Sequence, residues 1–200
     1  PEMVVMDTDA LATLPARQLA CGFAEVVKYG LLDSPGLFEV VEGWPALPGP
    51  ADALAALIRR CVDHKLAVVA ADERETGLRA SLNLGHTVGH GIEAAAGYEL
   101  YHHGEAISLG LLAALRLSER YAGLDPRWRE RTALLLERHG LPVRLDPSVA
   151  TDDVLAAMRR DKKAEAGALN MVMIGRPGDI RLRMSPEHGD VVAAIEELRR

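Results

Sequence analysis

The spacing of apolar residues along the chain predicts a mainly helical protein. Over residues 51–71, apolar side chains follow at steps of three and four, at Leu54, Ile58, Cys61 and Val68. This is the spacing of one face of a helix. Comparable patterns predict helices over residues 16–31, 82–96, 104–121, 126–139, 151–160 and 190–200. Glycine and proline separate these segments, most densely over residues 42–50, which cannot form regular structure.

Two segments have the pattern of β-strands. Residues 168–184 contain two strand-like runs on either side of the turn sequence GRPGD, which predicts one β-hairpin. Residues 1–7, PEMVVMD, form a short apolar strand pattern with nothing upstream to pair with. We therefore expect the downstream part of a longer protein: an orphan strand and connector over residues 1–15, then a multi-helical domain over residues 16–200.

Composition and charge narrow the class of protein. Apolar residues make up 48% of the chain and charged residues 26%, which is typical of a soluble globular domain. The net charge of −6 argues against a nucleic-acid surface but leaves room for a small anionic ligand. Cys21 and Cys61 lack metal-type spacing and are typical of a reducing compartment. No apolar run approaches the roughly 20 residues of a membrane span, and no signal peptide is visible, so we expect a cytoplasmic protein.

Histidine and glycine are concentrated over residues 83–106. His86 and His90 lie one helical turn apart, so both imidazoles project from one face of the predicted helix. Three glycines surround them: Gly85, Gly89 and Gly91. A glycine inside a helix costs about 1 kcal/mol relative to alanine, and close approach of another backbone or a ligand is the usual compensation. Two satisfied core histidines in a tightly packed helix are the alternative interpretation.

His102 and His103 follow after a turn, where an adjacent helix start can bring one imidazole back toward His86 and His90. Glu25 and Lys28 are three residues apart on an earlier helix, on a face that is otherwise small. The pair is either an ordinary surface ion pair or a pair packed against another element. A carboxylate and two imidazoles with an open position would form a catalytic metal site.

Several cations are candidates for binding an anion. Lys65 interrupts the apolar face of residues 51–71, and it either extends to solvent along that face or meets an anionic substrate. Glu75, Arg79, Asn83, His86 and His90 would form one polar line if the backbone were helical throughout, although Gly77 makes the first turn doubtful. The basic cluster RRDKK over residues 159–163 is either a solvated helix end or part of the same anion site.

Four blocks of the chain resemble the signatures of the 3-dehydroquinate synthase family, in order and spacing. They are LPARQLACGFAEVVKYGLL, KLAVVAADERETGLRASLNLGHTVGHGIE, HHGEAISLGLL and MRRDKK, and the resemblance covers nearly the whole chain. It implies a two-domain enzyme in which an NAD domain precedes a helical metal- and substrate-binding domain. Only the second is expected here, so the chain should not turn over alone. Gly91 departs from the resemblance, because alanine is expected at that position.

The resemblance also implies site residues, cofactors and assembly. The divalent metal, zinc or cobalt, falls on Glu25, His86 and His103. The NAD site falls on Ala10, Leu11, Ala12 and Thr13. The catalytic and substrate-binding positions fall on Lys28, Lys65, Glu75, Arg79, Asn83, His90 and Lys162 or Lys163. A homodimer is expected, with a small phosphorylated sugar acid as the substrate and neither nucleic acid nor membrane as a partner.

The implied reaction converts 3-deoxy-D-arabino-heptulosonate 7-phosphate to 3-dehydroquinate and phosphate, in the shikimate route to aromatic amino acids. Another sugar-phosphate cyclase, of the valiolone or inosose synthase type, is the nearest alternative; His90 within the intact NLGHTVGH favours the first interpretation. A metal-dependent polyol dehydrogenase would need no phosphate-binding lysines, so the lysine and arginine set counts against it. A non-enzymatic helical interaction domain would leave Glu25, His86 and His103 scattered.

Overall fold

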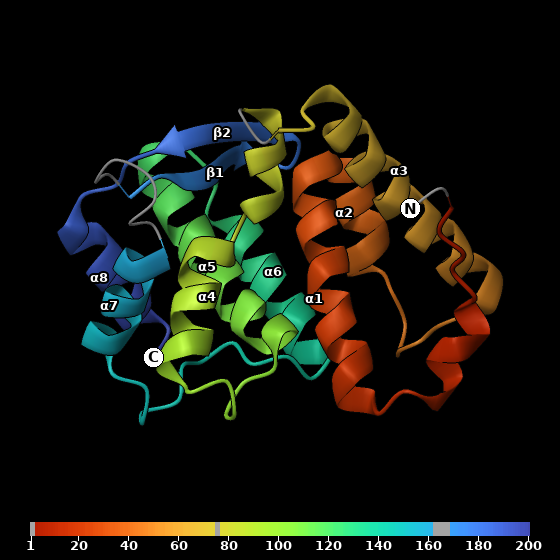
Figure 1. Ribbon diagram of the computed structural model, residues 1–200, viewed down its shortest axis with the longest axis horizontal. Coiled ribbons are helices and arrows are strands. Elements are labelled where there is room, and N and C mark those ends of the chain that lie inside the picture. Colours follow the sequence, from red (N-terminus) through yellow and green to blue (C-terminus); the bar gives the residue numbers. More distant parts are fainter. Residues whose placement is uncertain (1–2, 75–76, 162–168) are drawn as a thin grey trace.

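The computed structural model describes residues 3–74, 77–161 and 169–200, and these form a mainly helical domain with one β-hairpin (Figure 1). In chain order the elements are η1 (Thr8–Thr13), α1 (Ala16–Asp33), α2 (Pro35–Glu42), α3 (Ala51–Ala71), η2 (Leu78–Asn83), α4 (His86–Ala95), α5 (His103–Tyr121), α6 (Arg127–Arg138), α7 (Thr151–Asp161), β1 (Met171–Arg176), β2 (Asp179–Met184) and α8 (His188–Glu197). None of the helices that the structure describes is long and apolar enough to cross a membrane.

Helix α5 forms the centre of the core. Every residue from Gly104 to Leu115 is buried, because α1, α4, α6, α8 and β1 all pack against this helix. In Figure 1, α1–α3 lie on one side of α5, and α7 and α8 lie on the other. A helix that is apolar on all sides is stable only when it is surrounded in this way. Each leucine buried along α5 stabilises the fold by roughly 1.5–3 kcal/mol.

The hairpin is fixed to α5 by a buried hydroxyl group. β1 and β2 pair antiparallel, with Met171 opposite Met184 and Arg176 opposite Asp179. The Ser118 hydroxyl of α5 accepts a hydrogen bond from the Ile174 backbone N–H at 3.1 Å and donates one to the Ala114 carbonyl at 2.7 Å. The predicted hairpin is therefore confirmed, and its inner strand is part of the core.

Helix boundaries follow the predicted pattern closely in some places and depart from it in others. The helix predicted over residues 51–71 is confirmed as α3. The helix predicted from residue 82 begins only at His86, because η2 precedes it and Gly85 takes a left-handed backbone with φ of 79°. The described part of the predicted polar line, from Arg79 to His90, is therefore not one helix face.

Helix α2 was not predicted from the sequence. The segment DSPG (residues 33–36), which follows the helix predicted over residues 16–31, begins a second helix. Ser34 accepts a hydrogen bond from the Leu37 backbone N–H, and Pro35 occupies the first helical turn. Serine before the helix and proline at its first position are favourable start signals. At eight residues, α2 is too short to show a clear apolar period.

The orphan strand expected near the N-terminus stays a prediction, because its partner would belong to a part that precedes the helical domain. Residues 3–7 form no strand, and the side chains of Met3, Val4, Val5 and Met6 are exposed. A strand requires a hydrogen-bonded neighbour, and no described segment pairs with these residues. The connector that follows is partly ordered as η1, which Asp7 caps through a hydrogen bond from the Asp9 backbone N–H at 2.9 Å.

Candidate active site

Two glycines of α5 bring three helices together at the candidate site. A Cβ atom at Gly104 would lie 2.3 Å from the Cys21 carbonyl oxygen of α1. At Gly110 it would lie 2.1 Å from the Gly85 carbonyl oxygen and 2.6 Å from the Gly89 nitrogen, at the start of α4. No side chain fits at these distances, so the backbones touch. This close approach compensates for the helix-weakening glycines and places the first residue of α5 beside α1 and α4.

The close packing brings the three predicted metal ligands together. Glu25 Oε1 of α1 lies 3.4 Å from His86 Nε2 of α4 and 3.7 Å from His103 Nε2 of α5. The other carboxylate oxygen of Glu25 lies 2.5 Å from Lys28 Nζ. Lys28 is 4% exposed, so the Glu25–Lys28 pair is packed against other elements and is not an ordinary surface pair. Burying a charged pair of this kind requires good compensation from its surroundings.

His90 belongs to the same group of side chains. One ligand-capable nitrogen from each of His86, His90 and His103 lies within 4.8 Å of the others. The ring centroids of His86 and His90 are 5.3 Å apart, and those of His90 and His103 are 5.7 Å apart. The predicted role of His90 is toward the substrate, and this geometry puts it beside the predicted ligands. His90 is therefore placed to meet both a metal ion and a molecule bound to it.

The Nδ1 atoms of the two predicted histidine ligands, which lie on the side of each ring away from Glu25, have fixed partners. His86 Nδ1 lies 3.1 Å from the Leu84 carbonyl oxygen, and His103 Nδ1 lies 3.2 Å from Glu93 Oε2. Both partners only accept hydrogen bonds, so Nδ1 of each imidazole carries a proton. The Nε2 atoms of both rings face Glu25. Hydrogen bonds of this type orient metal-binding histidines in many sites.

Glu25 Oε1 is buried and has no hydrogen-bond partner among the described residues. Burial acts to raise the pKa of Glu25, but His103, His86 and Lys28 outweigh it and hold the pKa well below its usual range. The carboxylate is therefore ionised and faces two imidazoles through an unsatisfied oxygen. A divalent cation that prefers nitrogen and oxygen ligands, such as zinc or cobalt, fits this set of donors.

The predicted anion-binding residues are less closely grouped. Arg79 donates a hydrogen bond from its guanidinium to the Glu73 carbonyl at 2.7 Å, and its backbone N–H donates to Asp72 Oδ2 at 2.9 Å. Asn83 is exposed at the end of η2. Glu75, Lys162 and Lys163 lie outside the described residues. At the predicted NAD site in η1, the side chains of Ala10, Ala12 and Thr13 are exposed, and that of Leu11 is half-buried.

Lys65 is exposed on α3 and forms no ion pair with another described residue. The buried residues of α3 are Leu57, Cys61 and Val68. His64 takes the inward position next to Lys65, where its ring lies 5.7 Å from that of Tyr29. The catalytic role of Lys65 stays a prediction.

His102 is not part of this histidine group. It is exposed, and its backbone N–H donates to Glu105 Oε2 at 2.8 Å in the first turn of α5. Glu105 is in turn held by the Arg17 guanidinium at 2.7 Å. His102 is thus part of the helix start, whereas the neighbouring His103 belongs to the candidate metal group.

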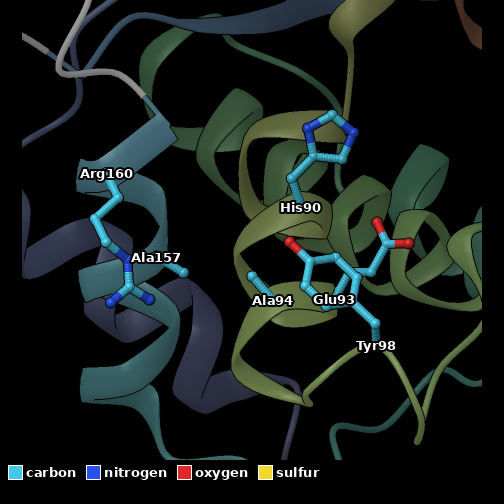
Figure 2. Close-up of a pocket in the computed structure, with 6 residues that line it drawn as sticks. All are labelled: His90, Glu93, Ala94, Tyr98, Ala157 and Arg160. Atoms are coloured by element: carbon cyan, nitrogen blue, oxygen red, sulfur yellow. The ribbon is translucent and has the colours of Figure 1, made fainter.

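A pocket next to the histidines was not foreseen. It has a volume of about 520 Å³ and lies between α4 and α7, lined by His90, Glu93, Ala94, Tyr98, Ala157 and Arg160 (Figure 2). Gly91 allows this packing of α7 on α4, since a Cβ there would lie 2.6 Å from Met158 Cγ. The spacing of Glu93, three residues after His90, could have indicated that both face this side of α4.

Comparison with known proteins agrees with the helical fold. The sequence profile of a family described as "3-dehydroquinate synthase C-terminal" matches residues 22–164. A 2-epi-5-epi-valiolone synthase from Streptomyces hygroscopicus subsp. jinggangensis, with NAD⁺ and Zn²⁺ bound, is 27% identical with a TM-score of 0.82, over 96% of this chain and 54% of that chain.

Two structures of 2-deoxy-scyllo-inosose synthase share the fold. One is complexed with carbaglucose-6-phosphate, NAD⁺ and Co²⁺; it is 24% identical with a TM-score of 0.82, over 96% of this chain and 55% of that chain. The other is 22% identical with a TM-score of 0.75, over 93% of this chain and 52% of that chain. The chain thus spans about half the length of these similar proteins.

Proposed function

Because the chain belongs to the family of 3-dehydroquinate synthase C-terminal domains, we propose that it is the metal- and substrate-binding part of an NAD-dependent 3-dehydroquinate synthase. The observation that carries the proposal is the buried, unpartnered carboxylate oxygen of Glu25, which faces the Nε2 atoms of His86 and His103. In a non-enzymatic helical domain, these three side chains would not be expected to lie close together.

Glu25, His86 and His103 would hold the divalent metal. When bound, the metal would polarise the substrate oxygens as a Lewis acid. Lys28 keeps Glu25 ionised and in place, through a contact of 2.5 Å. The carbonyl of Leu84 and the carboxylate of Glu93 orient the two imidazoles.

The remaining predicted residues would bind the substrate and move protons. His90 borders both the metal group and the pocket between α4 and α7, so its imidazole can exchange a proton with a molecule held there. Arg79, Lys65 and Lys162 or Lys163 would offset the charge of the phosphate and carboxylate groups, and Asn83 and Glu75 would orient hydroxyl groups. Preorganised charges of this kind stabilise the negative charge that develops during the elimination of phosphate.

The proposal includes an NAD-binding part beyond the helical domain. Residues 1–15 would form its boundary, with residues 10–13 against the cofactor. Two facts support this assignment: the similar valiolone synthase carries NAD⁺ and is almost twice as long as the part matched here, and apolar side chains at Met3, Val4 and Val5 are exposed. The homodimer and the cytoplasmic location also stay predictions.

A second candidate is a cyclase that accepts a different phosphorylated sugar. It is favoured by the two kinds of synthase found among the similar structures, which make a valiolone and an inosose. It would use the same metal group. The two candidates differ in the substrate, because only the heptulosonate carries a carboxylate.

An assay of the complete polypeptide that contains this chain, with zinc and NAD, separates the candidates. We expect release of phosphate and formation of dehydroquinate from 3-deoxy-D-arabino-heptulosonate 7-phosphate, and neither from a heptulose 7-phosphate without a carboxylate or from glucose 6-phosphate. Phosphate release only from a sugar phosphate without a carboxylate would favour the second candidate. Accumulation of NADH without phosphate release would instead indicate a polyol dehydrogenase. The H103N variant is the control for metal dependence.

A further inference from the structure

We propose that Glu93 is a positioning residue: its carboxylate holds the His103 imidazole with Nε2 toward Glu25, and so sets the affinity and coordination geometry of the metal site. The inference rests on the proposed metal site and extends it to a side chain that is not itself a ligand. The contact that carries it is the 3.2 Å distance between Glu93 Oε2 and His103 Nδ1.

The two predicted histidine ligands are held in different ways. His86 lies inside the fold with 14% of its side chain exposed, and its Nδ1 faces a main-chain carbonyl that no substitution can remove. His103 is the first residue of α5, and 47% of its side chain is exposed. Packing therefore restrains the His103 ring less, and the contact with Glu93 has to fix its rotation.

Glu93 itself is on a rigid part of the molecule. Its side chain is only 19% exposed, and it lies on α4 one helical turn after the buried Gly89. A Cβ at Gly89 would lie 3.2 Å from the Ala106 carbonyl oxygen, so the two helix backbones are close at this level. The distance from Glu93 to the start of α5 is thus set by backbone packing.

The chemical effect of the contact follows from the protonation of the ring. A carboxylate that accepts the Nδ1 proton fixes the orientation of the ring and makes Nε2 a stronger metal donor. Loss of such an outer partner typically weakens metal binding tenfold to a hundredfold. Glu93 also borders the pocket beside His90 (Figure 2). A substitution of Glu93 can therefore change both the affinity for the metal and the binding of substrate.

The test is a metal titration of the purified protein. Zinc affinity is measured by competition with a chelator, and the ligand field is measured from the visible absorption of bound Co²⁺. We expect E93A to bind zinc about tenfold to a hundredfold more weakly and to show an altered Co²⁺ spectrum. E93Q keeps a hydrogen-bond acceptor but loses the charge, so its affinity should lie between those of E93A and the wild type.

The matched control is E99Q, which changes an exposed glutamate six residues further along and should leave the affinity and the spectrum unchanged. Wild-type affinity and spectrum in E93A would overturn the proposal. If circular dichroism shows that E93A does not fold, the nearly isosteric E93Q decides, and an unchanged affinity and spectrum there would overturn it equally.

Failure of the underlying metal site gives a different result. If the wild type binds no zinc, or binds it equally well as H103N, then the proposed function loses its metal centre and the role of Glu93 falls with it. If H103N abolishes binding while E93A and E93Q match the wild type, the metal site stands and only the inference about Glu93 is wrong.

Discussion

The layer of α1, α4 and α5 and the outer helix α3 both carry predicted site residues, but they position them differently. In the layer, glycine contacts between backbones fix the relative positions of Glu25, His86 and His103. On α3, Lys65 is exposed and the neighbouring Leu66 is 59% exposed. Metal ligands need positions that are fixed before the ion binds, whereas a cation that meets a substrate can be ordered when the substrate arrives.

The largest effect is expected from a substitution that disrupts the packing of α1 on α5. G104A would place a methyl group 2.3 Å from the Cys21 carbonyl oxygen, and backbone atoms cannot move aside as a flexible side chain can. We expect the free energy of unfolding to fall by about 3 kcal/mol or more, together with loss of metal binding. Urea unfolding and zinc titration measure the two effects.

The control for this variant is G22A on α1. A Cβ at Gly22 would meet no atom within 4 Å, so alanine should raise the free energy of unfolding by about 0.5–1 kcal/mol through its higher helix propensity. Equal stability of the two alanine variants would contradict the assignment of Gly104 as a backbone contact.

The next effect compares two adjacent histidines. H103N removes a predicted ligand, whereas H102N changes an exposed residue at the start of α5 and supplies a favourable N-cap side chain. We expect zinc affinity to fall by on the order of a hundredfold or more in H103N, a change of about 2.7 kcal/mol, and to stay within about twofold in H102N. The reverse order in a chelator competition would exchange the roles of the two residues.

Lys65 tests the outer helix in the same way. Replacing it with methionine keeps the length of the side chain and removes the charge. Because Lys65 is exposed, K65M should change the free energy of unfolding by no more than about 0.5 kcal/mol and leave zinc affinity unaltered. Turnover by the complete enzyme should fall by roughly a hundredfold, the usual cost of losing one charge-stabilising group. Full activity of K65M would make Lys65 a structural surface residue.

The smallest effect concerns the link between the two regions. Asp33, at the end of α1, binds Arg60 of α3 at 2.7 Å and faces His64 Nδ1 at 3.3 Å. Burial acts to raise the pKa of Asp33, but Ser34, Arg60 and His64 lower it overall. A lowered folded-state pKa stabilises the protein above the unfolded-state value, about 3.9, and this stabilisation is lost as the pH falls through the folded-state pKa.

D33N should therefore lower the free energy of unfolding by about 1 kcal/mol at pH 7, because the pair with Arg60 is partly screened by solvent. The difference from the wild type should shrink as the pH falls below about 4, near the reference pKa of aspartate. Unfolding in urea at pH 7 and pH 3 measures this change. The control is D63N, on the exposed Arg59–Asp63 pair of α3, which should leave the free energy of unfolding almost unchanged at either pH. If D33N lowered the free energy of unfolding equally at pH 7 and pH 3, the charge-based explanation would be contradicted.

Sequence patterns predicted the long elements because periodicity accumulates over many residues. The apolar period located α3 and α5, and the turn sequence around Pro177 located the hairpin. Helix α2 was missed because eight residues are too few to show an apolar period. Residues 3–7 have the composition of a strand, but a strand depends on a partner that local pattern does not contain.

Some residues of the candidate site could also be predicted from the sequence, and others could not. Helical spacing and the family resemblance were enough to place Glu25, His86 and His103 together, because glycines fix the backbones that carry them. Glu93 was missed, since a glutamate three residues from a histidine usually indicates a solvated surface. The direction of Lys65 could not be predicted from the helical period, because the period left both His64 and Lys65 near the inner face and packing against Tyr29 selected His64.

Because α5 is buried, hydrogen exchange at its backbone amides can measure how much ion binding stabilises the fold. Amide hydrogens along Ile107–Leu115 lie where solvent reaches them only when the whole domain opens. Their rate of exchange with deuterium therefore reports the global unfolding equilibrium. An ion that binds only the folded state slows this exchange by the factor 1 + [L]/Kd, about a hundredfold at a free concentration of 100 Kd. A single set of α5 amides thus records, without a chromophore or a substrate, how much of the stability of the fold comes from the ion.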